Sequence, residues 1–504
     1  MKKILPLMIV FSTLLLNHLL LSPCSGAKVG NYLHMFEDKV SEFTLDNGLK
    51  FLVIEIHQVP IASFVTFVDA GGVNEKTGLT GIAHMFEHMA FKGTRNIGTK
   101  NWEKEKELLD ELDLAYREWR QARSRGDAKQ VERKRNKFKK LQKKAKNLTK
   151  PNEFSKILEK NGANNLNAGT STDATFYYTS LPANRAELWF NLESRRLRRP
   201  VFREFYTEKK VILEERYMRV QSNPTGKLIE RLQSIAYLAH PYGQPVIGWT
   251  SDIKSLRKSQ LKDFYRKYYL PENITIAVAG DITPQQVKKW AKLYFASWKK
   301  ASEPPQVKVK EPEQEGKRCF QINAAHEPVY VRAYRTVSQE HPDFLDLELL
   351  ATILAQGRTS RLYSSLVQEK MLASKITAFN GYPGTKFPSL FIVYAVPNEL
   401  VELSMLSEEI DSQLQKVKKG KITSQELQRA KTKSRADLVR TLDSNMGLAK
   451  SLVRAEGQRG DWKKVFTDLE KLQNITLKDL QEVAKKYLQE KKSVVGKLVD
   501  NRKE

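Results

Sequence analysis

The chain has 504 residues, with 85 Lys and Arg against 58 Asp and Glu, which gives a formal net charge of +27. This length allows two or more domains. The positive net charge favours binding to acidic surfaces or anionic substrates, but it says little about the fold. One of the two cysteines, Cys24, falls in a predicted leader. Cys319 would then remain alone, which excludes an internal disulfide.

The N-terminus has the parts of a secretory signal. Basic residues precede an apolar run at residues 4–21, and small residues up to Ala27 offer a cleavage site. We therefore expect residues 1–27 to be removed and the mature chain to be periplasmic or secreted. Lipidation at Cys24 is an alternative that Pro23 disfavours. An uncleaved anchor is a third, but the run is short for a membrane span and contains two polar residues.

The next predicted elements are two strands, at residues 51–56 and 64–69, and a buried helix at residues 80–91. Within this helix, His84 to His88 read H-x-x-E-H, the order of the inverzincin zinc sites. On a helix the two histidines are one turn apart on one face and can bind one zinc ion.

Glu87 shares the face of His84 and His88 and can take a proton from a water beside the metal. The alternative is two core histidines and a stray glutamate. Burying three such groups on an apolar helix without partners is costly, so the zinc site is the preferred interpretation.

Residues 100–150 form a charged block without proline, predicted to be two helices broken at residues 124–127. Nine of the fourteen residues 133–146 are Lys or Arg. We expect a solvated helical hairpin inserted in a loop, where insertions are tolerated. Nucleic-acid binding by this basic run is disfavoured, because aromatic residues are sparse and acidic residues crowd its first half.

A catalytic zinc normally takes three protein ligands, and the third is sought in a helical stretch that begins at Glu208. Glu214 and Glu215 are adjacent and point about 100° apart on a helix. Glu208 and Glu215 are seven residues apart and share a face with Val211 and Ile212, so this face is predicted to point inward. Glu215 is therefore the predicted ligand, and Glu208 a carboxylate that orients a ligand or tunes the bound water.

Residues 300–317 are rich in Pro, Glu and Lys and are predicted to be a linker. The halves on either side end alike, because residues 261–279 and 480–499 share the spacing of a helix, a turn and an apolar strand. This repeat predicts a duplicated α+β unit. Only the first copy carries H-x-x-E-H.

Together these motifs resemble the pitrilysin/insulinase family of zinc metallopeptidases, in its branch of bacterial proteins like the mitochondrial processing peptidase. The family carries H-x-x-E-H and a later helix with two glutamates seven residues apart, which Glu208 and Glu215 match. Residues 162–178, 240–248 and 273–281 are also typical of the family. The likeness covers nearly the whole mature chain.

The resemblance implies an α+β fold of two homologous α/β domains of the LuxS/processing-peptidase metallohydrolase type, which form half of a clamshell. Residues 28–299 would be the catalytic domain, residues 300–317 the linker and residues 318–504 a non-catalytic domain. The block at residues 100–150 exceeds the usual spacing of the family and would be an insertion in the catalytic domain.

In this family a peptide enters the chamber between the domains and adds a strand to an edge of the catalytic sheet. Asn167, Ala168, Gly169 and Thr170 match that edge. Backbone hydrogen bonds would then hold an unfolded or extended peptide with little demand on its sequence. An ordinary buried strand is the alternative.

These features predict a zinc-dependent endopeptidase of the cell envelope with one Zn²⁺ per chain. The ion would lower the pKa of its water and polarise the scissile carbonyl, and Glu87 would be the general base. A non-catalytic assembly or peptide-binding subunit on the same fold is the alternative, and a binder of anionic polymers is a weaker third. Related inactive subunits lose the H-x-x-E-H residues, and this chain keeps them all.

Full-length family members present an arginine and a tyrosine, seven residues apart, from the second half toward the bound peptide. Aligning residues 372–373 with the family pattern puts Val367 and Ser374 at these positions, and neither can steady an oxyanion. Arg361 and Tyr363 are nearby but displaced. We therefore expect a heterodimer with an inactive subunit that carries the Arg/Tyr pair, with a homodimer as the alternative.

Overall fold

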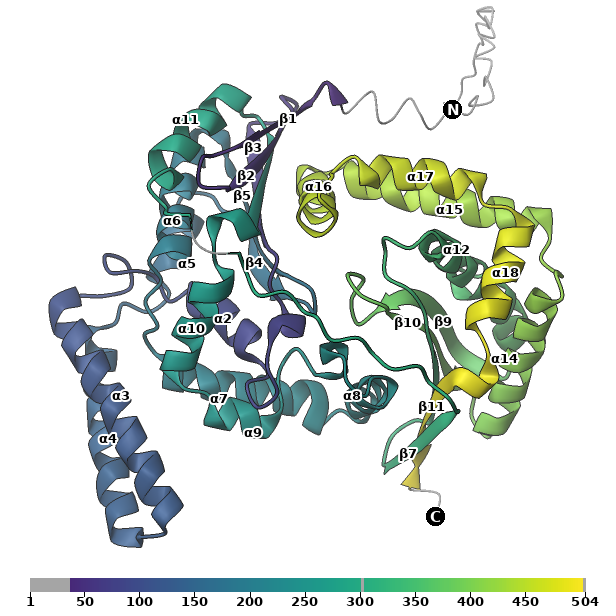
Figure 1. Cartoon of the computed structure of the whole chain (residues 1–504), viewed down its shortest axis with the longest axis horizontal. Helices are drawn as coiled ribbons and strands as arrows, with labels where there is room; N and C mark the ends of the chain where they lie inside the picture. Colours follow the sequence, from purple (N-terminus) through teal and green to yellow (C-terminus); the bar gives the residue numbers. More distant parts are fainter. Residues whose placement is uncertain (1–36, 301–302, 502–504) are drawn as a thin grey trace, which may run out of the picture.

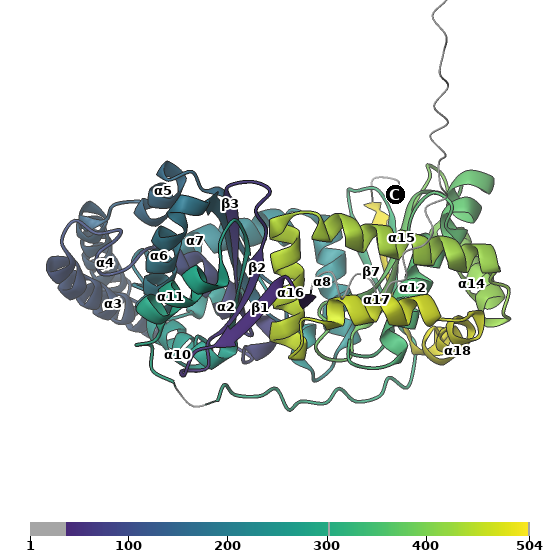
Figure 2. The ribbon, with the colours of Figure 1, turned by 90° about the horizontal axis from the view of Figure 1, so that it is seen from above.

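A computed structural model describes residues 37–300 and 303–501, so the signal predicted at residues 1–27 lies outside the described residues. The fold is α+β, as predicted, with two sheets that are each flanked by helices (Figure 1). Seen from above, the molecule is elongated, with α3 and α4 at one end and α14 and α18 at the other (Figure 2).

The first sheet has six strands in the order β1-β2-β6-β3-β5-β4. These strands are β1 (Val40–Thr44), β2 (Lys50–Glu55), β3 (Ile61–Val68), β4 (Asn164–Thr170), β5 (Thr175–Pro182) and β6 (Ile274–Gly280). β2 and β3 are the two strands predicted from the sequence. Phe51 and Val53 of β2 pack into the core on one face, and Leu52 and Ile54 pack on the other. Because both faces are covered, these strands are nearly continuous apolar runs.

The second sheet has five strands in the order β7-β11-β8-β10-β9. They are β7 (Arg318–Ala324), β8 (Val329–Arg335), β9 (Ala373–Tyr382), β10 (Leu390–Pro397) and β11 (Ser493–Asp500). β6 and β11 hold equivalent places, each parallel to one neighbour and antiparallel to the other. Each follows an eleven-residue helix, α10 (Lys258–Tyr268) or α18 (Leu477–Tyr487), and a 3₁₀ turn. The predicted repeat of helix, turn and strand is therefore present.

Each half of the chain contributes one helix that packs on the sheet of the other half (Figure 1). α16 (Asn445–Arg459) comes from the second half and lies on β3 and β6, where Leu448 and Leu452 complete one face of the first sheet. α8 (Pro224–Ala236) comes from the first half and covers β11 of the second sheet with Leu228 and Leu232. The core around each sheet therefore depends on residues from both halves.

The remaining helices surround these two sheets. They are α5 (Glu153–Lys160), α6 (Ala186–Arg198), α9 (Thr250–Ser255), α11 (Pro284–Phe295), α12 (Asp343–Ala355), α13 (Arg361–Tyr363), α14 (Leu403–Lys418), α15 (Ser424–Leu442) and α17 (Lys464–Asn474), besides those introduced elsewhere. Across residues 37–300 and 303–501, no helix combines the length and apolar character that a membrane span requires.

The linker predicted at residues 300–317 has no helix or strand over its described residues 303–317, but it is anchored to the body. The carboxylate of Glu311 accepts hydrogen bonds from the three successive amides of residues 238–240, at 2.7–2.9 Å. It also pairs with Arg335 of β8 at 3.1 Å. The connection between the halves is therefore fastened to both of them.

The block at residues 100–150 folds as two antiparallel helices, α3 (Trp102–Arg125) and α4 (Ala128–Leu148). They meet at Gly126, whose φ of 77° lies in the left-handed region that glycine adopts without strain. Asp127 then caps α4 by accepting a hydrogen bond from the amide of Gln130. Figures 1 and 2 show the hairpin projecting from one end of the molecule.

The base of this hairpin belongs to the core, which corrects the prediction of a solvated insertion in a loop. Glu105 and Arg203 are each 1% exposed and form a two-bond ion pair, at 2.9 and 3.1 Å. Tyr116 and Phe138 pack on each other in the same core. Residues 123–129 at the tip are exposed. The block also contains apolar residues at helical spacing, but charged residues dominate its composition, so the sequence suggested a solvated hairpin.

Glu105→Ala should lower the free energy of unfolding by about 3–5 kcal/mol, because the Arg203 guanidinium would stay buried without its carboxylate. Glu103→Ala is the matched control, since Glu103 lies in the same turn and is exposed, and it should cost less than about 0.5 kcal/mol. Denaturant unfolding measures both. Equal stability of the two variants would show that the hairpin base is not part of the core.

Candidate active site

The H-x-x-E-H motif lies on α2 (Ile82–Ala90), which begins after Gly81. Gly81 has a φ of 84°, and a Cβ atom there would meet the carbonyl oxygen of Ile247 at 2.7 Å, so the turn requires glycine. Glu75 accepts hydrogen bonds from the amides of Gly81 and Ala83, each at 2.8 Å. These bonds satisfy first-turn amides that a helix leaves open and hold the start of α2 in place.

The three predicted zinc ligands converge on one point. The rings of His84 and His88 lie one turn apart, with centroids 4.7 Å from each other. Glu215 comes from α7 (Phe205–Arg216), and its Oε2 lies 3.6 Å from Nε2 of each histidine. Ligands about 2.0–2.2 Å from a tetrahedral zinc lie roughly 3.3–3.6 Å apart, so this set of two imidazoles and a carboxylate fits the ion.

The face of α7 that points inward differs in part from the predicted one. Ile212 is buried beside Glu208, but Val211 is 44% exposed, which corrects the prediction that it shares the inward face. The inward positions are 208, 212 and 215, spaced four and three apart as a helical stripe requires. Glu214 is exposed. The structure thus brings Glu215, rather than Glu214, to the histidines.

Glu208 lies behind the histidine pair. Its Oε2 is 3.3 Å from Nδ1 of His88, and its Oε1 forms an ion pair with Lys92. A carboxylate that accepts the Nδ1–H of a histidine leaves Nε2 free for a metal and fixes the orientation of the ring. The predicted orienting role of Glu208 requires such a contact with His88, and Lys92 is a partner that the sequence did not reveal.

The two histidines differ in their electrostatic surroundings. Burial lowers the pKa of His84 to about 4, so its ring is neutral and available as a ligand. Burial also opposes a charge on His88, but hydrogen bonds to Glu208 and Glu215 outweigh it and raise the pKa of His88 to about 9. The carboxylates therefore favour a positive charge at this point, and a metal cation would supply one.

Arg219 is a site residue that sequence reasoning missed. It lies in a π-helical turn, Tyr217–Gln221, that follows α7 directly, and π turns are frequent at functional sites. Its Nη2 is 2.8 Å from Oε1 of Glu215, the carboxylate oxygen that the histidines do not face. The contact would hold Glu215, the predicted third ligand, in its orientation. The spacing of four residues from Glu215 was the available signal.

Glu87 lies beside this cluster and is held by the sheet. The Thr170 hydroxyl donates a hydrogen bond to Oε2 of Glu87 at 2.7 Å. Burial raises the pKa of the Glu87 carboxyl above its ordinary value, and the Thr170 bond works against this rise. Thr170 was predicted to contact substrate, and the structure adds a contact with the predicted general base.

The predicted substrate-binding residues, Asn167, Ala168, Gly169 and Thr170, lie at the end of β4. Among residues 37–300 and 303–501, this strand is the edge of the first sheet and pairs with β5 on one side only. Its residues are half-buried or exposed, unlike those of the central strands. The free edge of β4 therefore runs up to Glu87.

The two positions that were predicted to match the arginine and the tyrosine of the family lie in the second half. Val367 is in a π-helical turn, Ser364–Glu369, and Ser374 is at the start of β9. The hydroxyl of Ser374 lies 3.4 Å from the carbonyl oxygens of Val396 and Pro397. Neither side chain carries a positive charge or a long donor.

Glu208→Gln should weaken zinc binding about 10–100-fold, the usual cost of removing a group that supports a metal ligand. The amide can still accept a bond from His88 but loses the negative charge shared with Lys92. Competition with a chromophoric chelator measures the affinity. Glu204→Gln, which also removes a carboxylate near Lys92 (3.7 Å), is the control and should change the affinity less than threefold or so. Equal losses in both variants would contradict the orienting role.

Comparison with family models matches residues 50–113 and 139–249 to "Insulinase (Peptidase family M16)". Residues 255–434 match "Peptidase M16 inactive domain". Both models describe one family and together span most of the body of the chain. The chain belongs to peptidase family M16. The segment that the first model leaves unmatched, residues 114–138, is narrower than the insertion predicted at residues 100–150.

Curated relatives of this M16 peptidase agree with the family. The zinc protease PqqE of Helicobacter pylori is 29% identical over 472 residues, which are 90% of this chain and 91% of that protein. The mitochondrial-processing peptidase subunit beta of Saccharomyces cerevisiae is 25% identical over 451 residues, 85% of each chain. The two relatives are thus named as a zinc protease and as a subunit of a peptidase.

Solved structures share the two-domain M16 fold. A protease from Helicobacter pylori has a TM-score of 0.77 at 27% identity and covers 91% of this chain and 99% of its own. The periplasmic protease PqqL from Escherichia coli has a TM-score of 0.69 at 17% identity, which shows the fold alone. The match covers 92% of this M16 peptidase but 48% of PqqL, so this chain corresponds to about half of that larger protein.

Proposed function

We propose that this protein is a zinc-dependent endopeptidase that cleaves unfolded or extended peptides. The observation that carries the proposal is the convergence of His84, His88 and Glu215 on one point, 3.6 Å from carboxylate to each imidazole, beside Glu87. Three protein ligands leave a fourth position for water or substrate, which distinguishes catalytic from structural zinc sites.

The chemistry divides between the ion and the side chains. When bound, zinc polarises the scissile carbonyl and lowers the pKa of the attacking water. Glu87 accepts the proton of that water and returns it to the leaving amine, and the Thr170 hydroxyl fixes the carboxylate for both transfers. Glu208 and Arg219 hold His88 and Glu215 in their orientations.

The open edge of β4 supports the choice of substrate. A peptide that adds to this edge gains backbone hydrogen bonds along residues 167–170 and then passes Glu87, because Thr170 is the last residue of the strand. Such bonds use the main chain and need an extended segment. A folded protein has few extended segments with free main-chain groups, so this edge favours unfolded substrates.

We propose further that the protein acts in the cell envelope, on the basis of the secretory signal predicted from its sequence, and that its active form is a heterodimer. Val367 and Ser374 stand where the family has an arginine and a tyrosine, so a partner lacking H-x-x-E-H would supply that pair. The match to only half of PqqL supports an active particle of twice this length. A homodimer is the alternative.

The purified mature chain should bind one zinc ion, should cleave a fluorogenic unstructured peptide slowly, and should lose this cleavage with chelator and regain it with zinc. Sedimentation under the same conditions gives the oligomeric state. Full activity as a monomer or homodimer would contradict the heterodimer. Zinc binding without cleavage, even with the native partner added, would favour the non-catalytic subunit. Absence of zinc binding would overturn the proposed function.

A further inference from the structure

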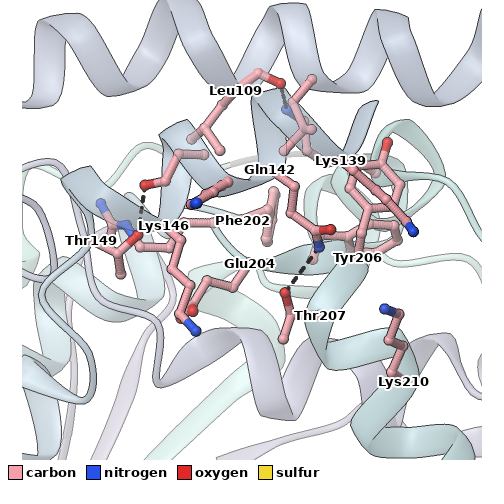
Figure 3. A pocket seen from close by; sticks show the side chains of 16 residues that line it. Leu109, Lys139, Gln142, Lys146, Thr149, Phe202, Glu204, Tyr206, Thr207 and Lys210 are labelled. Atoms are coloured by element: carbon pink, nitrogen blue, oxygen red, sulfur yellow. Dashed lines mark hydrogen bonds between the residues drawn. The ribbon is translucent and has the colours of Figure 1, made fainter. Parts of the chain in front are cut away.

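A cavity lies away from the proposed zinc site, between α4 of the hairpin and the first turn of α7 (Figure 3). Its volume is about 370 Å³, which lies within the range of small-molecule sites. Phe205 and Glu215 stand at opposite ends of α7, and ten residues at 1.5 Å per residue separate them by roughly 15 Å. The cavity is therefore distinct from the catalytic cluster.

The cavity has an apolar floor. Leu109 and Leu112 of α3 and Phe202 line it together with Phe205 and the ring of Tyr206. These residues are buried, and all of them except Leu109 belong to the core of the first half. Apolar surface that faces a cavity instead of a neighbouring side chain is a place where a ligand's hydrocarbon group gains free energy by leaving water.

The rim of the cavity is basic. Lys139, Lys143 and Lys146 of α4 line it at positions i, i+4 and i+7, so they lie on one face of the helix. Lys210 of α7 lines it from the other side. In Figure 3, Lys139 and Lys210 lie near Tyr206 at one side of the cavity, and Lys146 lies near Glu204 at the other.

The hairpin neutralises two lysines near its tip, Lys134 and Lys137, but none of those on the rim of the cavity. Near the tip, Glu118 of α3 pairs with Lys134 at 2.9 Å and with Lys137 at 3.4 Å. Within residues 37–300 and 303–501, no ion pair engages the four lysines of the rim; these are Lys139, Lys143, Lys146 and Lys210. Like charges one turn apart repel each other. A ligand anion would remove this repulsion.

The other polar groups of the cavity do not cancel this charge. Glu204 is the one carboxylate of the lining, and Lys92 lies 3.7 Å from it. Lys258 also lines the cavity, donates to the carbonyl oxygen of Leu109 at 3.2 Å and lies 3.8 Å from Asp110. Neutral hydrogen-bonding groups are present as well, since Gln142 donates to the Thr207 hydroxyl across the cavity at 3.2 Å.

We propose that this cavity binds a small amphiphilic anion, a single carboxylate or phosphate head with a short apolar tail. The lysines of α4 and Lys210 hold the head, and the floor of leucine and aromatic side chains takes the tail. A bare inorganic anion would leave the floor uncovered, and a neutral amphiphile would leave the lysines unpaired. The ligand therefore needs both parts.

Isothermal titration of the full mature chain, kept in zinc-containing buffer, tests the site with four probes below their micelle concentrations. Decanoate and decyl phosphate carry both parts, decanol lacks the charge and acetate lacks the tail. We expect saturable binding, one ligand per chain, for decanoate, decyl phosphate or both, and at least roughly tenfold weaker binding of decanol and acetate. The two anions also distinguish a carboxylate ligand from a phosphate ligand.

Two double variants separate the cavity from general electrostatics. Lys143→Gln with Lys146→Gln should weaken binding of the preferred anion roughly tenfold or more. Lys140→Gln with Lys144→Gln removes the same charge from exposed residues of the same helix that do not line the cavity, and binding should change less than about twofold. Thermal unfolding of all variants checks that each is folded.

Three results would overturn the proposal. The first is that neither anion binds. The second is that the two double variants weaken binding of the anion equally, which would assign the binding to the general positive charge of α4 and not to the cavity. The third is equal affinity for decanol and decanoate, which would make the cavity apolar in function. Peptidase activity is not a readout here, so failure of this inference is distinct from failure of the proposed function.

Discussion

Glu87→Gln is expected to keep the zinc ion and to lose peptide hydrolysis by at least roughly 10²–10⁴-fold, the contribution typical of a positioned general base. The carboxamide has nearly the shape of the carboxylate and can still accept the hydrogen bond from Thr170. It cannot accept a proton from water at neutral pH. The loss should therefore appear in kcat, with zinc content and KM close to those of the parent protein.

Metal analysis and steady-state kinetics on the same preparation check this expectation. Glu75→Gln is unsuitable as a control, because Glu75 holds the start of α2. Glu187→Gln serves instead, since Glu187 is an exposed residue of α6 that bonds Tyr294. If Glu87→Gln strips the metal, Glu87 is a ligand; if it retains turnover, another group is the base.

Glu215→Gln is expected to lose zinc and activity together, while Glu214→Gln should leave both nearly unchanged. The two glutamates are adjacent and receive the same substitution, but only Glu215 reaches the histidines and Arg219. Loss of a direct ligand should exceed the 10–100-fold cost of losing a supporting group. Because zinc binds the folded state, Glu215→Gln should also melt at a lower temperature than the parent in zinc-containing buffer.

Equilibrium dialysis and thermal unfolding with and without added zinc measure these effects. In the absence of zinc, the melting temperatures of Glu215→Gln and the parent should differ by less than in its presence, since the substitution then removes only the contacts of Glu215 with the histidines and Arg219 and no bound ion. A variant Glu214→Gln that strips the metal while Glu215→Gln retains it would reverse the assignment of the third ligand.

The geometry of the predicted metal-binding residues follows in large part from the regular geometry of the helix, which can be read from the sequence. The α-helix places residues four apart on one face, so the spacing of His84 and His88 predicts a shared metal. Positions 208 and 215 are two turns apart, and the same rule put them on one face, although it wrongly placed Val211 there. The apolar runs of β2 and β3 and the repeated unit at β6 and β11 are likewise local patterns, set by main-chain geometry and side-chain periodicity.

The contacts between segments that are distant in the chain could not be predicted from local sequence patterns. Thr170 meets Glu87 because β4 ends beside α2, and the hairpin base enters the core because Arg203 needs the carboxylate of Glu105. These pairs are 83 and 98 residues apart in the chain.

The sequence by itself determined the H-x-x-E-H motif, the helix that carries the proposed third ligand, the α+β class and the repeat, because each depends on the regular geometry of one helix or strand. Tertiary structure alone decided the exchange of α8 and α16 between halves, the partners of Glu87 and Glu215, and the basic cavity under α4. These depend on which surfaces meet when the whole chain packs. Many weak contacts decide that jointly, and no short segment encodes it.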